Sequence, residues 1–483
     1  MNSVLITFLL FRIGITIGYW KLFEKAGIAG WKSLIPFYSE YLIAVDIVGK
    51  PTWWIVYLII PVVNIFAWYV LMFNVLRCFG KESIWSQILM IFIAPIYLPV
   101  LGFNSTIKYR GKLDSLPPVK RTAVQEWADA IVFAVVAATL IRWLIMEAYT
   151  IPTPSMENSL LVGDFLFVSK FHYGTRTPKT PLQIPLTHQK IWFTEIPSYV
   201  EWIQLPQYRL PGISEVKRGD VVVFNVPGMM ENNWGLPKSQ WKKYPTDLKT
   251  NYIKRCVGLP GDDLEIKNRQ VIVNGTPLDN PENMQFSYSV LSKDVINQRN
   301  LDKLDLTPAE DYTGPRVTRD GAYYTMQLTN TLAGELKSLP YIKSVTINEL
   351  KYDSVNSTFP HSTRFKWTGD NFGKLTIPKA GWTIQLNDST LALYGSTITD
   401  HDHNEDASIK GGKLFIDGKE VTSYTFRQNY YFMMGDNRHN SHDSRYWGFV
   451  PEDHIVGKGF FIWLSIDRAK GGIRWNRLFN LVR

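Results

Sequence analysis

The sequence predicts an N-terminal helical membrane domain followed by a mainly-β extracytoplasmic domain with a β-rich insertion. Three observations lead to this prediction. Long apolar runs are confined to about the first 146 residues. After residue 155 the chain alternates short β-branched runs with Gly, Asn and Asp turns, which is typical of strands and hairpins. Much of the excess positive charge lies in short loops between the apolar runs, as in membrane proteins.

The composition indicates a folded chain with several domains. The 483 residues are 46% hydrophobic and 14% aromatic, which supplies apolar surface for cores and spans and excludes a disordered chain. The formal net charge of +9 favours membrane orientation over nucleic-acid binding, because of where the basic residues lie. The two cysteines, Cys78 and Cys256, are too few for a disulfide framework and do not define the redox compartment.

Residues 1–112 are predicted to form a membrane module with about three spans. The apolar runs Val4–Tyr19, Trp53–Leu76 and Ile84–Phe103 are each about long enough to cross a bilayer, at ~20 residues per crossing. Gly27–Lys50 is too short and interrupted, so we expect an interfacial or re-entrant segment. The first run is interpreted as a retained span and not a signal peptide, since an arginine interrupts it and no small-x-small cleavage site follows.

A fourth span is predicted to anchor the remainder of the chain. Residues 113–126 form a cytoplasmic linker and residues 127–148 a transmembrane anchor. Basic residues are dense in the loops before Trp53 and after Phe103, and sparse in the turn between them. The positive-inside rule therefore makes these two loops cytoplasmic. The N-terminus then lies outside, and residues 149–483 lie on the extracytoplasmic side.

Strand and hairpin signals fill the extracytoplasmic part. Val221–Phe224 follows an Arg-Gly-Asp turn, while Gln270–Val273 runs into Asn-Gly and Lys413–Ile416 into Asp-Gly. These dipeptides are typical of two-residue hairpins. Residues from about 280 to 400 are strand-rich and polar without recognisable chemistry, so we interpret them as an inserted subdomain.

The candidate catalytic residues lie in three separated stretches, which are residues 152–156 (PTPSM), 254–262 (KRCVGLPGD) and 435–445 (GDNRHNSHDSR). Alone, the first stretch would be explained by prolines that end a helix and a serine in a turn. A serine hydroxyl is a weak nucleophile that needs an adjacent base. A lysine can be that base once its pKa falls from ~10.4, and burial can lower it by about 3–5. Lys254 has apolar neighbours, and Ser441 can hydrogen-bond a neutral amine, although a Lys-Arg pair is ordinarily solvated.

In order, and with Gly163-Asp164 after the first stretch, these motifs closely resemble those of the bacterial type I signal peptidases, or leader peptidases. The resemblance spans roughly Trp127 to the C-terminus, apart from the insertion and one long loop. It implies a serine endopeptidase with a Ser-Lys dyad on a β-fold, which removes signal peptides from exported preproteins. It further implies a multi-pass protein of the bacterial inner membrane, with no cofactor and no metal.

The resemblance also implies roles for individual residues. These are Ser155 as nucleophile, Lys254 as general base, Thr153 as the side-chain donor of the oxyanion hole, Ser441 as the residue that orients Lys254, and Asp443 and Arg445 as a supporting ion pair. The chain departs from the family pattern at Pro154, where glycine is usual, and at Glu157-Asn158, where Pro-Thr is common. The first departure affects the geometry of the oxyanion loop, and neither removes a reacting group.

Three other patterns in the sequence resemble catalytic or metal-binding motifs. Ser441-His442-Asp443 holds the members of a serine triad, but adjacent side chains in a strand point to opposite faces. Ser214–Lys217 and Ser239–Lys242 match an S-x-x-K motif without its partner motifs. His401-Asp402-His403 offers metal ligands but lacks a third ligand nearby, so a solvated turn is favoured.

Two functions of different classes follow. The first is the signal peptidase, whose partners are preproteins with signal peptides, the lipid bilayer and, as a further candidate, the protein-export machinery, with no nucleic acid. The second is a non-catalytic membrane scaffold with a protease-like ectodomain. The aromatic segment His188–Leu210 is predicted to pack on the outer leaflet, or alternatively to form a satellite core over the β-domain.

Overall fold

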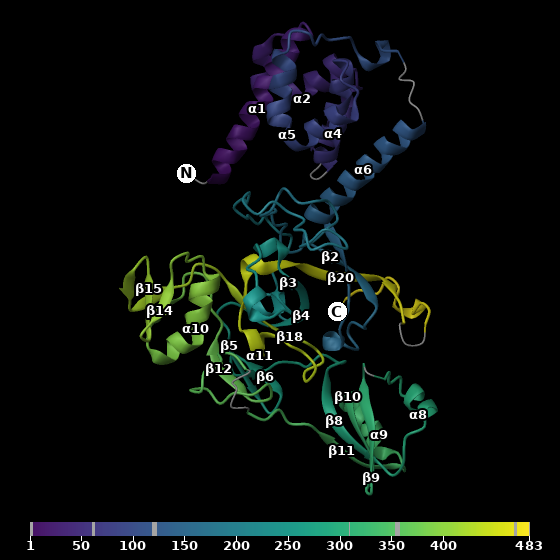
Figure 1. Cartoon of the computed structure of the whole chain (residues 1–483), viewed down its shortest axis with the longest axis vertical. Helices are drawn as coiled ribbons and strands as arrows, with labels where there is room; N and C mark the ends of the chain where they lie inside the picture. The colour runs from purple at the N-terminus through teal and green to yellow at the C-terminus, as the bar shows by residue number, and fades with distance from the viewer. Residues whose placement is uncertain are drawn as a thin grey trace. The chain divides into compact units, whose positions relative to one another are not determined.

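The computed structural model describes residues 3–59, 63–117, 123–308, 310–352, 358–467 and 471–482. The chain forms two compact units, Met1–Leu140 and Ile141–Arg483. Figure 1 shows that the described strands all lie in the second unit and the long helices in or at the border of the first. The mainly-β domain predicted for the C-terminal part of the chain is therefore confirmed.

The first unit is helical. Its longer helices are α1 (Ser3–Lys25), α4 (Val63–Cys78) and α5 (Ile84–Phe103). Glycine allows α1 and α5 to approach closely, because a Cβ at Gly18 would lie 2.4 Å from the Cβ of Leu98. The sequence Gly27–Lys50 folds as the short helices η1 (Gly30–Leu34), α2 (Tyr38–Leu42) and η2 (Ile43–Val48), as expected for a segment too short to cross a membrane.

Within the described residues, α5 is the helix long and apolar enough to cross a membrane, and it coincides with the predicted span Ile84–Phe103. The run Trp53–Leu76 is divided into η3 (Thr52–Ile55), α3 (Val56–Ile59) and α4, and its residues 60–62 lie outside the described residues. The multi-span character of this unit therefore stays a prediction.

The helix α6 (Ala123–Leu144) covers most of the predicted anchor 127–148. It ends four residues early, because Met146 begins strand β1 (Met146–Thr150) and pairs there with β2 (Asp164–Ser169). Residues 118–122 of the predicted linker lie outside the described residues. An ion pair ties the last helical turn to the sheet, since Arg142 Nε lies 2.6 Å from Glu147 Oε1.

The main sheet has seven strands in the order β1-β2-β20-β3-β4-β18-β19. Its further members are β3 (Val221–Asn225), β4 (Asn251–Gly258), β18 (Tyr430–Met434), β19 (Val450–Pro451) and β20 (Ile455–Ser465). Neighbouring strands run antiparallel. Val221 and Val223 pack into one core cluster while Val222 and Phe224 pack into another. Both faces of the sheet are thus buried at β3. This explains why successive residues of β3, which point to opposite faces, are all apolar from Val221 to Phe224.

A second sheet contains the predicted hairpins. It orders β12 (Phe372–Thr376), β5 (Asp263–Lys267), β6 (Gln270–Val273) and β7 (Thr276–Pro277). A separate sheet joins β14 (Ser408–Lys410), β15 (Lys413–Ile416) and β16 (Lys419–Val421). The turn residues Asn274, Gly275, Asp417 and Gly418 all have positive φ. This is the geometry of the two-residue turns that Asn-Gly and Asp-Gly favour, so both hairpin predictions are confirmed.

The predicted insertion contains two structures (Figure 1). The first, called here the inserted sheet, is the four-stranded sheet β11-β8-β10-β9 with two helices, which spans residues 285–347 and has its own core. Its elements are β8 (Gln285–Ser292), α8 (Gln298–Lys303), β9 (Tyr312–Thr318), β10 (Gly321–Thr329), α9 (Asn330–Ser338) and β11 (Ile342–Ile347). The remainder, with β12, β13 (Thr383–Gln385) and α10 (Asp388–His401), shares a core with β5 and β6. Strand β13 pairs with β17 (Ser423–Thr425).

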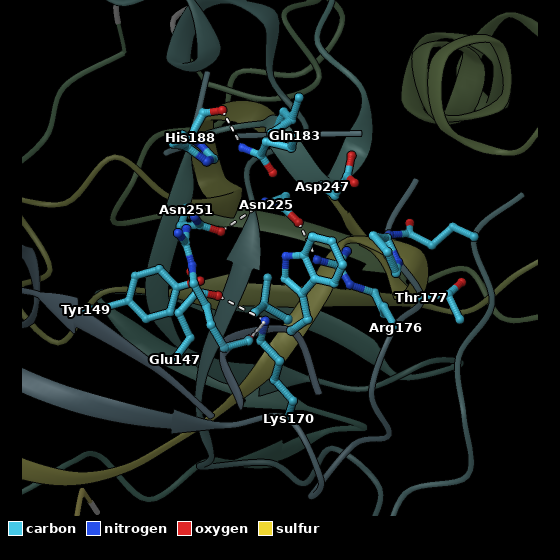
Figure 2. Close-up of a pocket in the computed structure, with 16 residues that line it drawn as sticks. Glu147, Tyr149, Lys170, Arg176, Thr177, Gln183, His188, Asn225, Asp247 and Asn251 are labelled. Carbon is cyan, nitrogen blue, oxygen red and sulfur yellow. Dashed lines mark hydrogen bonds and ion pairs between the residues drawn. The ribbon is translucent and has the colours of Figure 1, made fainter. Parts of the chain in front are cut away.

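The chain between β2 and β3 forms a long loop that two half-buried arginines hold at its base. Arg209 donates from Nη2 to the carbonyls of Glu452 (2.8 Å) and Ile455 (2.7 Å). Arg176 donates to Asn225 Oδ1 at 2.6 Å, and with Lys170 it lines a polar cavity of about 80 Å³ (Figure 2). These contacts fix the loop to the main sheet.

Several large apolar side chains of this loop are exposed. Trp192 is 58% exposed, Trp202 is 84% exposed, and Phe193 is fully exposed. The alternative of a satellite core is therefore wrong for these three aromatic residues. They form an exposed apolar surface on the second unit.

Candidate active site

Ser155 lies in a single 3-10 turn, η5 (Pro154–Met156), between β1 and β2. Pro154 opens this turn, where the missing N–H of proline costs no helical hydrogen bond. The turn is held through its carbonyls, because the side chain and backbone nitrogens of Asn437 donate to Pro154 O and Ser155 O, each at 3.1 Å. The first and third sequence stretches therefore meet.

Lys254 of the second stretch reaches the same point. It lies in β4 opposite Val222 and is 4% exposed. Its Nζ is 2.7 Å from Ser155 Oγ and 2.9 Å from the carbonyl oxygen of Ile253. Burial lowers the pKa of Lys254 to about 8, although the charge of nearby carboxylates acts in the opposite direction. A large fraction of this amine is thus neutral near pH 8 and able to accept the proton of Ser155.

Gly435 brings Ser441 close to the turn that carries Ser155. A Cβ at Gly435 would lie 2.2 Å from Ser441 Oγ and 2.5 Å from Ser155 O, so a larger residue does not fit between them. The Ser441 side chain is buried, and among the described residues its hydroxyl makes no hydrogen bond to Lys254. That it orients the lysine stays a prediction.

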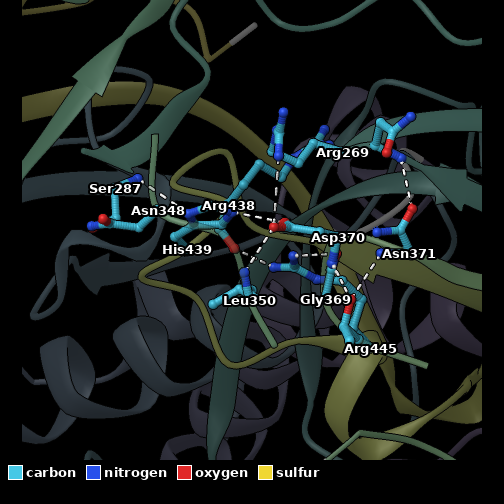
Figure 3. Close-up of polar contacts among 12 residues, drawn as sticks. Arg269, Ser287, Asn348, Leu350, Gly369, Asp370, Asn371, Arg438, His439 and Arg445 are labelled. Carbon is cyan, nitrogen blue, oxygen red and sulfur yellow. Dashed lines mark hydrogen bonds and ion pairs between the residues drawn. The ribbon is translucent and has the colours of Figure 1, made fainter. Parts of the chain in front are cut away.

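Asp443 and Arg445 form a buried ion pair, with Arg445 Nε and Nη2 each 2.8 Å from a carboxylate oxygen. Burial acts to raise the pKa of Asp443, but the charge of Arg445 holds it below its usual value. Asp443 also accepts a hydrogen bond from Gly435 N at 3.0 Å, and Arg445 donates to Gly369 O (Figure 3). The pair therefore fixes the backbone on which Gly435 and Ser441 lie.

A second buried ion pair was not singled out from the sequence. Arg255 contacts both carboxylate oxygens of Asp436, with Nε at 2.8 Å and Nη2 at 2.6 Å, and Ser159 Oγ donates to the same carboxylate at 2.6 Å. The carboxylate of the third stretch thus binds the second stretch and Ser159, which follows the first stretch by three residues. The available signal was the opposite charge of Arg255, which follows Lys254, and Asp436, which lies within the third stretch.

Thr153 precedes the turn with an extended backbone and an exposed side chain. Its hydroxyl makes no hydrogen bond within the part of the chain that the structure describes, and it does not cap η5. The hydroxyl is thus free to meet a ligand near Ser155, and its oxyanion role stays a prediction.

The rival catalytic patterns are not assembled. His442 Nδ1 lies 3.2 Å from Glu231 and its ring stacks on Tyr446, while the carboxylate of Asp443 binds Arg445. The Ser441-His442-Asp443 triad is therefore absent. Lys217 and Lys242, the lysines of the two S-x-x-K matches, are both exposed, so burial does not make either one a neutral base.

The prediction of a solvated turn at residues 401–403 is wrong for its middle residue, Asp402. Asp402 is fully buried and accepts hydrogen bonds from the hydroxyls of Tyr424 (2.6 Å) and Tyr430 (2.7 Å). These tyrosines come from distant strands, so the short pattern did not reveal them. Among the described residues, no group of three or more His, Cys, Asp or Glu side chains is arranged to hold a metal ion.

The chain was compared with known protein families. The family described as signal peptidase, peptidase S26, matches residues 124–331 and 351–464, which is about two thirds of the chain. The match runs through the long loop and most of the predicted insertion, which the motif resemblance had left out. A family of unknown function, DUF5684, matches residues 31–112.

Individual relatives are similar over about 70% of the chain. A signal peptidase I of Buchnera aphidicola from Schizaphis graminum is 28% identical over 359 residues, which covers 71% of this chain and 77% of that protein. The signal peptidase I of Aquifex aeolicus is 27% identical, covering 68% and 80%. That of Haemophilus influenzae is 25% identical, covering 71% and 72%.

Proposed function

The chain belongs to the signal peptidase family, peptidase S26, and from this premise we propose that Ser155 and Lys254 are its catalytic dyad. The chain is a serine endopeptidase that removes signal peptides from preproteins. The observation that carries the proposal is the 2.7 Å distance between Lys254 Nζ and Ser155 Oγ in a buried setting. A serine beside a buried lysine with a lowered pKa has the arrangement of a nucleophile next to its general base.

In the proposed mechanism, neutral Lys254 takes the hydroxyl proton as Ser155 Oγ attacks the scissile carbonyl. The lysine then gives this proton to the leaving amine, and a water molecule, activated by the same base, hydrolyses the acyl-enzyme. The Thr153 hydroxyl and the Ser155 backbone N–H stabilise the oxyanion. Ser441 orients the amine, and the Asp443–Arg445 pair supports Ser441.

The experiment that tests this function is incubation of the purified protein with a preprotein, followed by N-terminal sequencing of the product. A single cleavage after a small-x-small segment is expected. The non-catalytic scaffold is the alternative, and it predicts binding without a new N-terminus. The assembled dyad favours the enzyme, because a binding module has no need of a buried lysine beside a serine.

We propose further that the chain is a multi-pass protein of the bacterial inner membrane, with its catalytic domain extracytoplasmic. The apolar helix α5 and the anchor 127–148, much of which is α6, support this. Residues 1–112 serve as anchor or as a contact with the protein-export machinery. A tag at either end of this module, probed with a protease added to intact spheroplasts, tests the orientation.

The exposed apolar surface on the long loop is proposed to lie on the outer leaflet. Arg142, in the last turn of α6, donates to the carbonyl of Thr187 in this loop at 3.3 Å. The loop therefore passes beside the end of the anchor at Thr187. Aromatic residues such as Trp192 and Trp202 favour the membrane interface, where a signal peptide is presented.

A further inference from the structure

The inserted sheet touches the catalytic machinery through its first strand residue. Gln285 donates from its backbone N to Asp436 O at 3.0 Å, and its carbonyl accepts from Arg438 N at 2.9 Å. These two bonds make a parallel bridge between Gln285 and Asn437. The start of β8 is thus an extra strand beside the catalytic loop, defined here as residues 435–445.

Asn437 connects that bridge to the nucleophile. The residues on either side of Asn437 bind Gln285 through Asp436 O and Arg438 N. Asn437 itself donates from its backbone N to Ser155 O and from Nδ2 to Pro154 O. Two layers of hydrogen bonds therefore separate the inserted sheet from the turn that carries Ser155. A displacement of β8 would move Asn437 and, with it, the nucleophile turn.

His439 is a second connection between the inserted sheet and the catalytic loop (Figure 3). Its Nδ1 accepts the backbone N–H of Ser287 at 3.3 Å, and its Nε2 lies 2.8 Å from Asp370 Oδ1. The ring packs against Phe286, with 5.1 Å between ring centres. Both ring nitrogens are engaged, so the imidazole bridges β8 to the chain that follows the inserted sheet.

Asp370, the partner of His439, is itself held in place by a second hydrogen bond. Its second oxygen accepts the backbone N–H of Leu350 at 2.9 Å. Burial acts to raise the pKa of Asp370, but the hydrogen bonds from His439 and Leu350 hold it below its usual value. The carboxylate is therefore ionised at neutral pH and a strong acceptor for His439.

Arg438, the residue before His439, is held through its backbone. Arg438 is 2% exposed, yet its Nε and Nη1 have no hydrogen-bond partner among the described residues. Its backbone is held instead by Gln285 and by Arg445, whose Nη2 donates to Arg438 O at 2.6 Å.

From these contacts we propose that the inserted sheet positions the nucleophile turn, with His439 as the positioning residue that couples the two. The proposal rests on the proposed role of Ser155. It gives the inserted sheet a part in catalysis that does not require contact with substrate. It also predicts that loosening His439 lowers kcat, because the turn leaves its reactive geometry more often, while KM stays near its parent value.

The test compares three variants of the full chain. His439→Phe keeps the ring and removes both hydrogen bonds, whereas His439→Gln keeps a donor for Asp370. Tyr324→Phe is the matched control, because it removes a buried hydrogen bond of the same sheet, from Ile296 N at 2.9 Å, without touching the catalytic loop. We expect kcat to fall at least tenfold in His439→Phe, to recover severalfold in His439→Gln, and to stay within twofold of the parent in Tyr324→Phe.

A second readout does not depend on turnover. Amide hydrogen exchange of the peptide that contains Met156–Ser159 should quicken in His439→Phe and not in Tyr324→Phe. Parent kcat and parent exchange in His439→Phe would overturn the proposal, as would equal losses of kcat in His439→Phe and Tyr324→Phe at matched melting temperatures. If the parent chain itself cleaved no preprotein, the proposed function would fail, while the exchange experiment would still decide the coupling.

Discussion

Lys254 Nζ lies 2.7 Å from Ser155 Oγ although the two residues are 99 positions apart in the chain. The main sheet creates this contact, because β4 carries the lysine through a buried position and β1 and β2 flank the turn that carries the serine. If the pair is the dyad, Ser155→Ala and Lys254→Met should each abolish cleavage in a protein that is still folded. Product formation and melting temperature are measured together.

Lys249 provides a matched control for the lysine. It is also buried, burial lowers its pKa to about 8, and its Nζ lies 2.9 Å from His454 Nε2 and not beside a serine. Lys249→Met should therefore keep its turnover. Turnover in Lys254→Met equal to that of the parent would contradict the dyad.

The pH dependence follows from the direction of the Lys254 shift. Burial lowers its pKa to about 8, and only the neutral amine accepts the serine proton. The rate of cleavage should therefore rise with pH through about 8 and level off above it, and a metal chelator should leave it unchanged. His442→Gln should keep this profile, because His442 faces Glu231. A midpoint near ~6.5 that disappears in His442→Gln would instead indicate a histidine base.

The contact between Ser155 and Lys254 was predictable because motif order and side-chain chemistry suffice to name a serine and a lysine. The ion pair and hydrogen bond at Asp436 were not predictable, since its partners Arg255 and Ser159 lie 181 and 277 residues away in the chain. Such contacts depend on strand order, which no local pattern specifies. The hairpins were predictable for the opposite reason, because Asn-Gly and Asp-Gly determine their turns locally.

Element boundaries were less predictable where an apolar run served two structures. The run that forms α6 continues into β1, and hydrophobicity alone does not separate a helix end from a buried strand start. Strand pairing between the predicted insertion and the chain before it was likewise not visible in the sequence. Strand β12 pairs with β5, which precedes the inserted sheet by some twenty residues.

Thr153 provides a test of the oxyanion hole. Its exposed hydroxyl has no intramolecular role within the described residues, so removing it should cost little stability. Thr153→Ala should lower kcat by roughly 10–1,000-fold with little change in KM, as the loss of an oxyanion donor does. Thr153→Ser retains the hydroxyl and should retain most of the activity. Steady-state kinetics of both variants test this prediction. A fully active Thr153→Ala would show that the Thr153 hydroxyl is not a donor to the oxyanion.

Gly435 should tolerate no side chain. A Cβ there meets Ser441 Oγ at 2.2 Å and Ser155 O at 2.5 Å, so Gly435→Ala must displace the nucleophile turn or Ser441. We expect a loss of at least tenfold in kcat together with a lower melting temperature. Gly334 in α9 is the control, since a Cβ there meets nothing within 4 Å. Gly334→Ala should leave activity unchanged and stabilise the helix by up to about 1 kcal/mol. An active and stable Gly435→Ala would show that the two serines need not meet there.

The last prediction concerns the exposed apolar surface of the long loop. Phe193 is fully exposed, and Val317 in the inserted sheet is 67% exposed, so each is open to labelling as a cysteine. The native Cys78 and Cys256 are buried and free, so they should react slowly. A polarity-sensitive dye at Phe193→Cys in the full chain, reconstituted in lipid vesicles, should emit at shorter wavelength. Spin-labelled lipids should quench it. The dye at Val317→Cys should show neither effect. Trp192→Ser combined with Phe193→Ser should leave the melting temperature unchanged, because these side chains have no core to leave, and should lower the activity in vesicles. Equal quenching at the two labelled positions would reject the outer-leaflet contact.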